Sequence, residues 1–316
     1  MHDPLTFLDG CAEQGLNGGV RTLIELAERI AALKARPAPL SLLPGLIVSS
    51  IASPTTPAGS LARPMLAMVA QGAKRTVLAD RVYEYQTGQY LVSALDLPVT
   101  GQVTEASLAR PFLGLGLPLN ESIIAQLVLE AGPGKVDDSG SGIVTADADE
   151  ELIDAVVRLL RLLDRPREFA VLGPGVEREI HWRLMNGPHA ALVRRIGISD
   201  SRVSVVRRAV RWITEHYDRA IRIAEIADHV GVSEATLNRH FRAVTAMSPL
   251  QYQKQIRLSR ARARLLAAPD DIAGVGHAVG YDSPSQFNRE YRRMFGVPPG
   301  QDAVRLQGTV LVDEGV

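Results

Sequence analysis

The chain has 316 residues, its 35 Lys and Arg balance 35 Asp and Glu, and 46% of it is apolar. This length predicts two domains, and no apolar run reaches the ~18 residues that a membrane span needs. The first residues lack the basic and apolar regions of a secretory signal, and a single cysteine, Cys11, excludes an intrachain disulfide and a cysteine metal cluster. We therefore expect a cytoplasmic protein.

The N-terminal region predicts one helix followed by a set of short strands. Apolar side chains recur at helical spacing from about 20 to 35, until Pro37 and Pro39 stop the pattern. From about 46 to 117, runs rich in Val, Leu and Tyr alternate with turn residues every 8 to 12 residues or so, which indicates a small antiparallel sandwich or barrel. The expected strands are Leu46–Ile51, Met65–Val69, Arg75–Leu78, Arg81–Tyr85, Tyr90–Ala94, Val99–Glu105 and Phe112–Leu117.

The side chains of this strand region argue against a metalloenzyme. All seven histidines lie outside residues 40–120, so the strands cannot supply a cluster of imidazole ligands. We expect no metal, no cofactor and no catalytic residue. Tyr83 and Tyr85 point to one face of a strand because they are two residues apart. With Tyr90 they form a candidate effector-binding pocket, and ordinary packing of a half-buried sheet is the alternative.

Helices are predicted to follow the strands. Asn120 is the expected N-cap of a short helix that ends at Gly132. An amphipathic helix should then run from about Asp149 to Leu163, and its leucine stripe belongs either to the core or to a homodimer interface. Shorter helical pieces are expected after it, with breaks at Gly173–Gly175 and Asn186–Pro188.

Charge is distributed unevenly about an expected hinge at Ile198–Arg202. Residues 1–200 carry a net charge of −5, whereas residues 201–300 carry +7. A basic segment of this length is where a polyanion should bind. Of the 35 cations 31 are arginine, whose planar fork suits phosphate and guanine edges, although a biased genome composition would produce the same count.

The basic segment contains an internal repeat. Sliding Ser233–Pro249 by fifty positions places it on Ser283–Pro299, and the turn glycines upstream, Gly231 and Gly280, match with a shift of forty-nine. Each copy predicts a short helix, a turn with glycine, a serine N-cap and a second helix, which is the outline of a helix-turn-helix. The aligned pairs are Ser233/Ser283, Leu237/Phe287, Asn238/Asn288, Arg239/Arg289, Phe241/Tyr291, Arg242/Arg292 and Pro249/Pro299.

Helical geometry separates a core face from a contact face in both copies, at about 233–244 and 283–295. Arginine bonds guanine, and asparagine bonds adenine, in the major groove. The alternative is that these side chains only solvate a helix or touch phosphate; the same polar pattern in both copies favours contact with bases. The candidate DNA-binding residues are Ala235, Thr236, Asn238, Arg239, Arg242, Ser285, Gln286, Asn288, Arg289 and Arg292.

One long helix is predicted between the two copies, from Pro249 to Leu266. It is apolar on two sides, so it should pack on two sides and act as the spine of both units. Its length of ~25 Å would allow the two reading helices to lie about 34 Å apart, one turn of DNA. Arg257, Arg260 and Arg264 fill a sector between the apolar stripes, where they face either phosphates or solvent.

The C-terminal segment resembles the DNA-binding domain of the AraC/XylS family of transcription regulators. Two departures from the family pattern occur. Ala246 stands where the family often has glycine, and Asp302 and Ala303 replace a usual aromatic-arginine pair, which puts the packing of the final cap in doubt. The resemblance rests on Ile226–Ser233, Leu237–Phe241, Met247–Tyr252, Ile256–Leu258, Val279–Tyr291 and Phe295–Pro299.

The N-terminal half is similar, less sharply, to the cupin-like regulatory domain of one branch of that family. The similarity is carried by Met68–Arg75, Tyr83–Tyr85, Gly88–Val92 and Leu97–Val99. It implies a role in effector binding or dimerisation. The expected fold is thus α+β: a cupin-like β-barrel with flanking helices, then an all-α domain with two helix-turn-helix motifs joined by a long helix. The expected boundaries are 1–198, helical from about 120, then 203–304 and a tail at 305–316.

The function expected from residues and resemblance together is sequence-specific DNA binding by an effector-responsive activator, not an enzyme. Its partners would be double-stranded promoter or operator DNA, an unknown small molecule and RNA polymerase. Two other classes compete with this hypothesis. A metal-free barrel enzyme or a DNA-repair alkyl acceptor would need a reactive group, for which Cys11 is the only thiol. An architectural DNA binder is disfavoured because the polar residues form narrow stripes and the whole chain is neutral.

Overall fold

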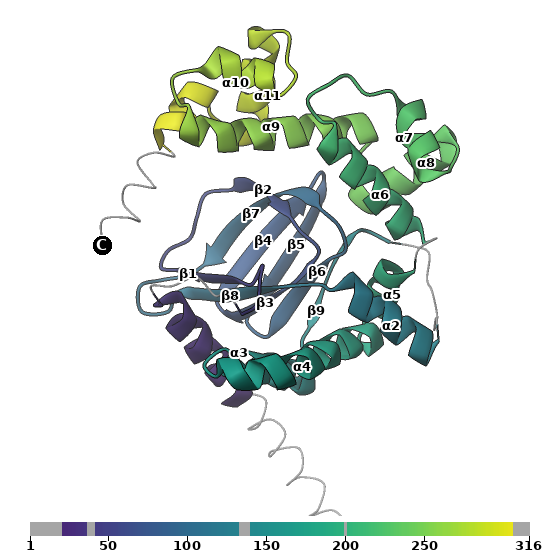
Figure 1. The fold of residues 1–316 in the computed structure, drawn as a ribbon. Helices are drawn as coiled ribbons and strands as arrows, with labels where there is room; N and C mark the ends of the chain where they lie inside the picture. The colour runs from purple at the N-terminus through teal and green to yellow at the C-terminus, as the bar shows by residue number, and fades with distance from the viewer. Residues whose placement is uncertain (1–20, 37–41, 133–139, 199–200, 306–316) are drawn as a thin grey trace, which may run out of the picture.

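The computed structural model describes residues 21–36, 42–132, 140–198 and 201–305. An N-terminal β-sandwich flanked by helices is followed by a C-terminal group of helices that lies along one end of the sandwich (Figure 1). The α+β class and the order of strands before helices, as predicted from the sequence, are confirmed. Cys11 and the tail after Arg305 lie outside the described residues.

Two antiparallel sheets form the sandwich. The order is β1-β8-β3-β6-β9 in the first sheet and β2-β7-β4-β5 in the second, and the sheets do not close into a barrel. The seven expected strands are all present; β2 and β9 were not predicted, because neither short segment shows a clear alternation of apolar and polar residues. The strands are β1 (Ile47–Ile51), β2 (Ala58–Ala62), β3 (Met65–Gln71), β4 (Ala73–Leu78), β5 (Arg81–Gln86), β6 (Gln89–Ser93), β7 (Leu97–Glu105), β8 (Phe112–Pro118) and β9 (Ile143–Asp147).

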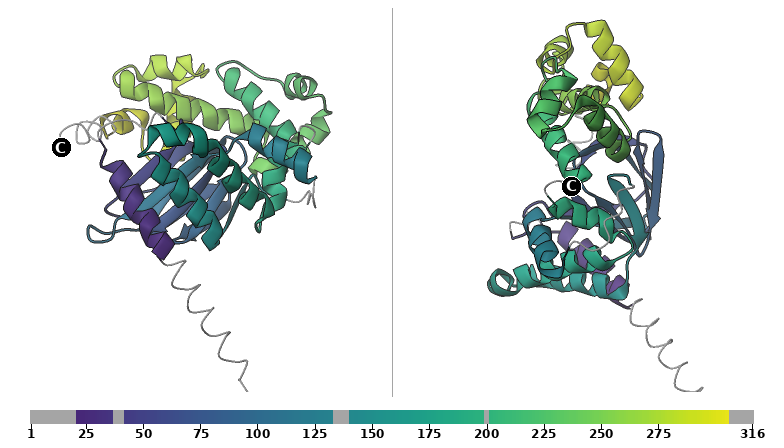
Figure 2. Two further views of the ribbon diagram at one scale, coloured as in Figure 1. Left: turned by 60° about the horizontal axis from the view of Figure 1, so that its bottom comes forward. Right: turned by 90° about the vertical axis from the view of Figure 1, so that its right-hand side faces the viewer.

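The first sheet buries one face beneath helices. β3 and β8 pair in the middle of this sheet, and their alternate residues Leu66, Met68, Leu115 and Leu117 are buried. The helices that follow the strands are α2 (Glu121–Ala131), α3 (Glu150–Leu162), α4 (Pro166–Asn186) and α5 (Ala190–Gly197). The helix at 21–34, α3 and α4 lie across the sandwich, and α2 and α5 lie beside it, next to α6 (Arg202–Glu215) (Figure 1 and Figure 2).

The structure decides one open alternative in this helical layer and corrects one expected break. The leucine stripe of α3 belongs to the core, because Leu159 and Leu160 are each only 1% exposed. The expected break at Gly173–Gly175 is absent: α4 continues through Pro174 for 21 residues. The packing of α4 against α3 outweighs the local cost of proline in a helix. These contacts include two hydrogen bonds of 2.8 Å from Arg158 Nη2 to the Glu179 carboxylate. Asn120 caps α2 as predicted.

The C-terminal helices form two units on one spine. The chain enters through α6 (Arg202–Glu215); α7 (Ile223–Val230) and α8 (Glu234–Thr245) form the first helix-turn-helix. The long helix α9 (Pro249–Ala267) leads to the second, formed by α10 (Ile272–Ala278) and α11 (Pro284–Phe295). The two units lie toward opposite ends of α9 (Figure 1), and a last helical segment covers residues 299–305.

The buried apolar residues form two clusters, and the two helix-turn-helix units belong to different ones. The buried residues of the first unit, such as Phe241, Val244 and Tyr252, belong to the same cluster as the sandwich. Those of the second unit, such as Phe287 and Tyr291, form a separate cluster with Leu258 and Leu265 of α9. The first helix-turn-helix is therefore packed onto the N-terminal domain, and the right view of Figure 2 shows the C-terminal helices stacked against the sandwich.

Both reading helices end on a residue in the left-handed backbone conformation, an alanine in one and a glycine in the other. Exchanging alanine and glycine at these ends should therefore change the stability in opposite directions. Ala246 after α8 and Gly296 after α11 have φ of 60° and 80°. A left-handed alanine costs about 1–2 kcal/mol, whereas glycine costs about 0.4–1 kcal/mol of unfolded-chain entropy. We expect Ala246→Gly to raise the free energy of unfolding by about 0.5–1 kcal/mol and Gly296→Ala to lower it by as much.

Urea denaturation of the full chain measures both effects. Gly296 offers a clean site, because a Cβ placed there meets no heavy atom within 4 Å, so only the backbone conformation is tested. Ala246→Gly that leaves the unfolding midpoint unchanged, together with a neutral Gly296→Ala, would show that neither helix end is strained.

Candidate nucleic-acid interface

Helix α8 presents a narrow polar face because its apolar residues are all turned inward. The Ser233 side chain accepts a hydrogen bond from the Thr236 backbone N–H and so fixes the first turn. Leu237, Phe241 and Val244 are each fully buried. The opposite side of the helix is in solvent, with Asn238, Arg239 and Arg242 all exposed.

Helix α11 repeats this arrangement fifty residues later. Ser283 caps it by accepting a bond from the Gln286 backbone N–H, and Pro284 occupies its first position. Phe287 and Tyr291 are buried, with their ring centroids 5.6 Å apart. The duplicated sequence therefore folds into duplicated local structure.

The structure places all ten predicted DNA-binding residues on these two faces. Thr236 and Gln286 are half-buried and bonded locally: the Ser233 hydroxyl donates to the Thr236 hydroxyl, and the Gln286 amide donates to Glu290 Oε1 over 3.0 Å. The other eight are exposed: Ala235, Asn238, Arg239, Arg242, Ser285, Asn288, Arg289 and Arg292. The arginines of both predicted faces therefore remain accessible in the described part of the chain.

The arginine sector of α9 has a structural task that the sequence did not indicate. The Arg257 guanidinium donates to three carbonyl oxygens: Tyr217 and Gly280 at 2.6 Å and Arg219 at 3.0 Å. Arg257 was expected to face phosphate or solvent; instead it joins the segment before α7 to the turn before α11. Because one carbonyl belongs to the second unit and two precede the first, Arg257 fixes the orientation between the units.

The glycine in the second turn makes this junction tight. Gly280 has φ of 89°, and a Cβ on it would lie 2.2 Å from the Asp218 carbonyl oxygen. Gln253, one turn before Arg257, donates its side-chain amide to the same Tyr217 and Arg219 carbonyls. The matching Gly231 in the first unit has open space around it, so only the second turn carries this contact.

The altered final cap forms a buried charged cluster in place of the family's aromatic-arginine pair. Asp302 is 1% exposed; it accepts a bond from Arg262 Nε at 2.8 Å and from the Tyr291 hydroxyl at 2.8 Å. Burial, together with this bond to a carboxylate, raises the pKa of Tyr291 well above its usual range. The cap thus connects the back of α11 to α9, and its packing is resolved where the sequence left it in doubt.

The tyrosines predicted for effector binding are packed in the N-terminal domain, and Tyr90 lies beneath the helices, beside Gly187 at the end of α4. Tyr85 and Tyr90 are 4% and 3% exposed, and burial raises the pKa of Tyr90 to about 12. Tyr83 is half-buried, and its hydroxyl lies 2.6 Å from the Ser141 hydroxyl oxygen. The three side chains are therefore packed, and none of them lines the clefts described next.

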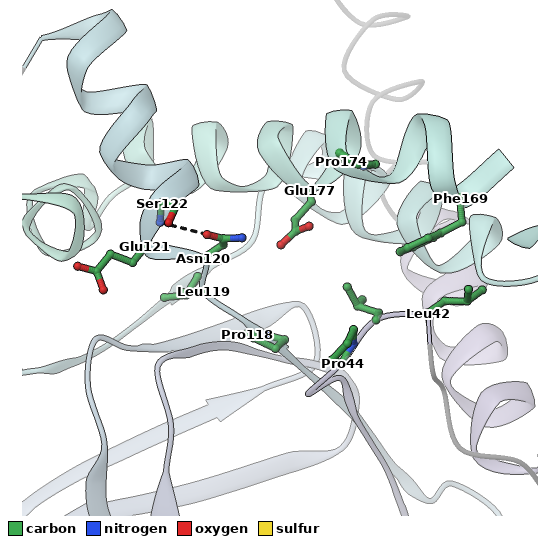
Figure 3. A pocket seen from close by; sticks show the side chains of 11 residues that line it. Leu42, Pro44, Pro118, Leu119, Asn120, Glu121, Ser122, Phe169, Pro174 and Glu177 are labelled. Carbon is green, nitrogen blue, oxygen red and sulfur yellow. Dashed lines mark hydrogen bonds between the residues drawn. The ribbon is translucent and has the colours of Figure 1, made fainter. Parts of the chain in front are cut away.

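Several clefts of ligand size lie elsewhere in the described chain. One of about 520 Å³ opens between α4 and the start of α2, where Phe169 and Pro174 face Leu42 and Pro118 with the Glu177 carboxylate between them (Figure 3). Behind it His181 is buried and accepts a bond from the Asn120 N–H at 2.8 Å. Burial lowers the pKa of His181.

Another cleft, of about 580 Å³, lies between the sandwich and the C-terminal helices. Its apolar lining includes Val99 and Met247, and its charged lining comprises Arg293 and the ion pair of Lys254 with Glu290. Within the described ranges no group of three metal-ligating side chains is present, and no helix there is long and apolar enough to cross a membrane.

Two family models match the two parts of this structure. Residues 42–192 match the N-terminus of AraC-type transcriptional regulators, and residues 226–303 match a helix-turn-helix domain. The chain belongs to the AraC-type family of transcriptional regulators. The resemblance noted in the sequence is thereby confirmed for both halves.

Curated relatives match part of this chain in sequence. The transcriptional regulator ArgR of Pseudomonas aeruginosa is 31% identical over 153 residues, which cover 48% of this chain and 46% of ArgR. The arabinose operon regulatory protein of Salmonella typhimurium is 30% identical over 135 residues, covering 41% of this chain and 48% of that protein. The chain thus spans less than half the length of these curated relatives.

A solved family member shares the fold over most of its length. ToxT of Vibrio cholerae O395 superimposes with a TM-score of 0.52 at 12% identity, covering 83% of this chain and 98% of ToxT. A second ToxT structure, bound to (E)-4-(8-methylnaphthalen-1-yl)but-3-enoic acid, gives a TM-score of 0.54 at 11% identity over 82% of this chain and 97% of ToxT. At this identity the likeness concerns the fold alone.

Proposed function

We propose that this protein is a sequence-specific DNA-binding transcription regulator whose helices α8 and α11 enter successive major grooves on one face of the duplex. The observation that carries the proposal is the pair of exposed polar faces on two matching helices, both attached to α9. Arginine and asparagine on such faces suit guanine and adenine edges. The Arg257 contacts support it further, because they hold the two units in one relative orientation.

The ten residues on α8 and α11 are the proposed contacts. In this proposal residues 1–198 are the regulatory part, residues 203–304 the DNA-binding part and 305–316 a tail. Activation through RNA polymerase is the proposed outcome, in keeping with relatives such as the transcriptional activator RhaS of Pectobacterium carotovorum. The chain acts as a regulator in this proposal and has no catalytic task.

A small-molecule effector is part of the same proposal, and the cleft between the domains supports it best. The cleft combines apolar side chains with Arg293 and with Lys254, whose ammonium group lies 3.4 Å from the Glu290 carboxylate in the same lining. Arg293 is the lining cation left to bind an acid, which suits an amphiphile with a carboxylate. ToxT, the neighbour in fold, has been solved with such an acid bound. The packed tyrosines Tyr83, Tyr85 and Tyr90 form the second proposed location, which requires their packing to open. A carboxylate amphiphile that leaves the melting temperature and DNA affinity of the full chain unchanged would contradict the first location.

DNA selection tests the proposed function. The full chain should enrich one duplex sequence from a random pool and bind it ~10³-fold or more tighter than unselected duplex at physiological salt. The logarithm of the binding constant should fall linearly with the logarithm of salt concentration, since arginines displace counterions from phosphates. Equal binding of selected and unselected duplex, or no binding at all, would contradict the proposal.

A further inference from the structure

The turn between β4 and β5 lies beside the first reading helix. Leu78 pairs with Arg81 across a two-residue turn, and Ala79 in that turn borders the same interdomain cleft as Ala246 and Met247 at the end of α8. The N-terminal domain therefore reaches the DNA-binding helix through a short, defined hairpin.

A second set of contacts holds this hairpin in place. Tyr83, on the same face of β5 as Arg81, contacts the Ser141 hydroxyl through its own hydroxyl. The next residue, Gly142, donates its N–H to the Val244 carbonyl of α8 over 2.8 Å. A Cβ on Gly142 would lie 2.7 Å from Leu95 and 3.0 Å from Val244, so the segment is tightly enclosed. β5 is thus connected to α8 by a short path of direct contacts.

Arg81 joins the polar face of α8 as a result. A groove of about 500 Å³ is lined by Arg81, Asn238, Arg239, Arg242 and Ala243. Three of these five side chains are guanidinium groups, and the lining includes no acid. In the part of the chain that the structure describes, the hydrogen bonds and ion pairs do not involve the side chains of Arg81, Arg239 or Arg242.

The charge of this groove favours the binding of an anion. Arginine keeps its charge at physiological pH, so three guanidinium groups around one groove give it a positive potential that favours an anion. Guanidinium groups bind phosphate oxygens through parallel N–H donors. A helix in the major groove has a sugar-phosphate strand on each side of it. A cation held beside the helix by a different element is therefore positioned for that strand and not for the bases.

We propose that Arg81, from the regulatory domain, binds a DNA phosphate at the edge of the major groove that α8 enters. This inference rests on the proposed function and extends it: the sandwich supplies part of the DNA-binding surface directly. Arg239 and Asn238 reach the base edges, and Arg81 adds a contact that does not depend on base sequence.

Arg81→Ala in the full chain tests this contact. We expect roughly tenfold weaker binding to both the selected and an unselected duplex. The slope of the logarithm of the binding constant against the logarithm of salt concentration should become smaller in magnitude by ~0.9, the change expected for the loss of one phosphate contact. Arg81→Lys should recover most of the slope, because it keeps the charge. The matched control is Arg110→Ala, an exposed arginine of the same domain that follows β7 near the opposite end of β4.

The outcomes separate this inference from the proposed function. If the wild-type chain selects no duplex, the proposed function fails and Arg81 is not the reason. If it does, unchanged affinity and slope in Arg81→Ala overturn the phosphate contact. Tighter binding by Arg81→Ala overturns it as well, and would show that the β4–β5 turn obstructs the duplex. A loss confined to the selected duplex would assign Arg81 to base contact instead.

Discussion

Replacing Arg239 or Arg289 by alanine is expected to weaken binding to the selected duplex by about 1–3 kcal/mol each while leaving the fold intact. Both side chains are exposed at equivalent positions of α8 and α11, and neither takes part in a hydrogen bond or ion pair among the described residues. Their removal therefore costs contacts with DNA and no contacts within the protein. The double variant should lose about 2–6 kcal/mol, because the two sites share no contacts and their effects should add.

Competition binding with selected and unselected duplex measures the effect. A base contact lowers the ratio between the two affinities, whereas a phosphate contact lowers both affinities alike. Arg167→Ala is the matched control, since Arg167 is exposed on α4 at the far side of the sandwich. Equal losses on both duplexes would identify Arg239 and Arg289 as phosphate contacts and contradict their proposed part in sequence recognition.

Arg257→Met should produce the second large effect, on stability and on binding together. The variant keeps most of the side-chain stem but leaves the carbonyls of Tyr217, Arg219 and Gly280 without their charged donor. Hydrogen bonds to charged groups contribute about 1.5–3 kcal/mol each and are not additive, so we expect the free energy of unfolding to fall by roughly 2–5 kcal/mol. The ring of Tyr281, 5.8 Å from the guanidinium, also loses a cation–π contact.

The effect on DNA binding is diagnostic of the orientation between the two units. Affinity for a duplex with both half-sites should fall more than affinity for a duplex with one, because Arg257 holds the second unit relative to the first. Arg260→Met is the control on the same helix, since Arg260 is exposed and its guanidinium lies 6.0 Å from the Tyr217 ring centroid. Gly280→Ala provides an independent test at the same junction, because its Cβ would meet the Asp218 carbonyl. Equal losses on one and two half-sites would reduce Arg257 to a purely stabilising role.

Phe241 and Val244 of the first unit are packed in the same cluster as the sandwich, so α8 and the sandwich share one core. The second unit has its own cluster and meets the sandwich mainly at β2, where Phe295 and Met294 lie against Gly59. The two reading helices therefore contact the N-terminal domain in different ways.

Local sequence was sufficient to predict the features that depend on near neighbours. The serine caps of α8 and α11, their inward apolar residues and their outward Asn238 and Arg239 follow from helical spacing and from an N-cap preference. Seven strands followed from alternation and turn residues for the same reason. The repeat also predicted the second helix-turn-helix, since the same pattern of residues fifty positions later favours the same local structure.

Tertiary structure alone decided what depends on contacts between distant residues. α4 remains a helix through Pro174 because α3 packs along it, and the leucines of α3 point into the core because the sandwich lies beneath them. Arg257 bonds three carbonyls and Arg81 borders α8 because segments separated by at least 20 residues in the chain are brought together. No periodicity in sequence records which carbonyl or which helix an arginine will meet, because long-range packing determines that choice and local propensity does not.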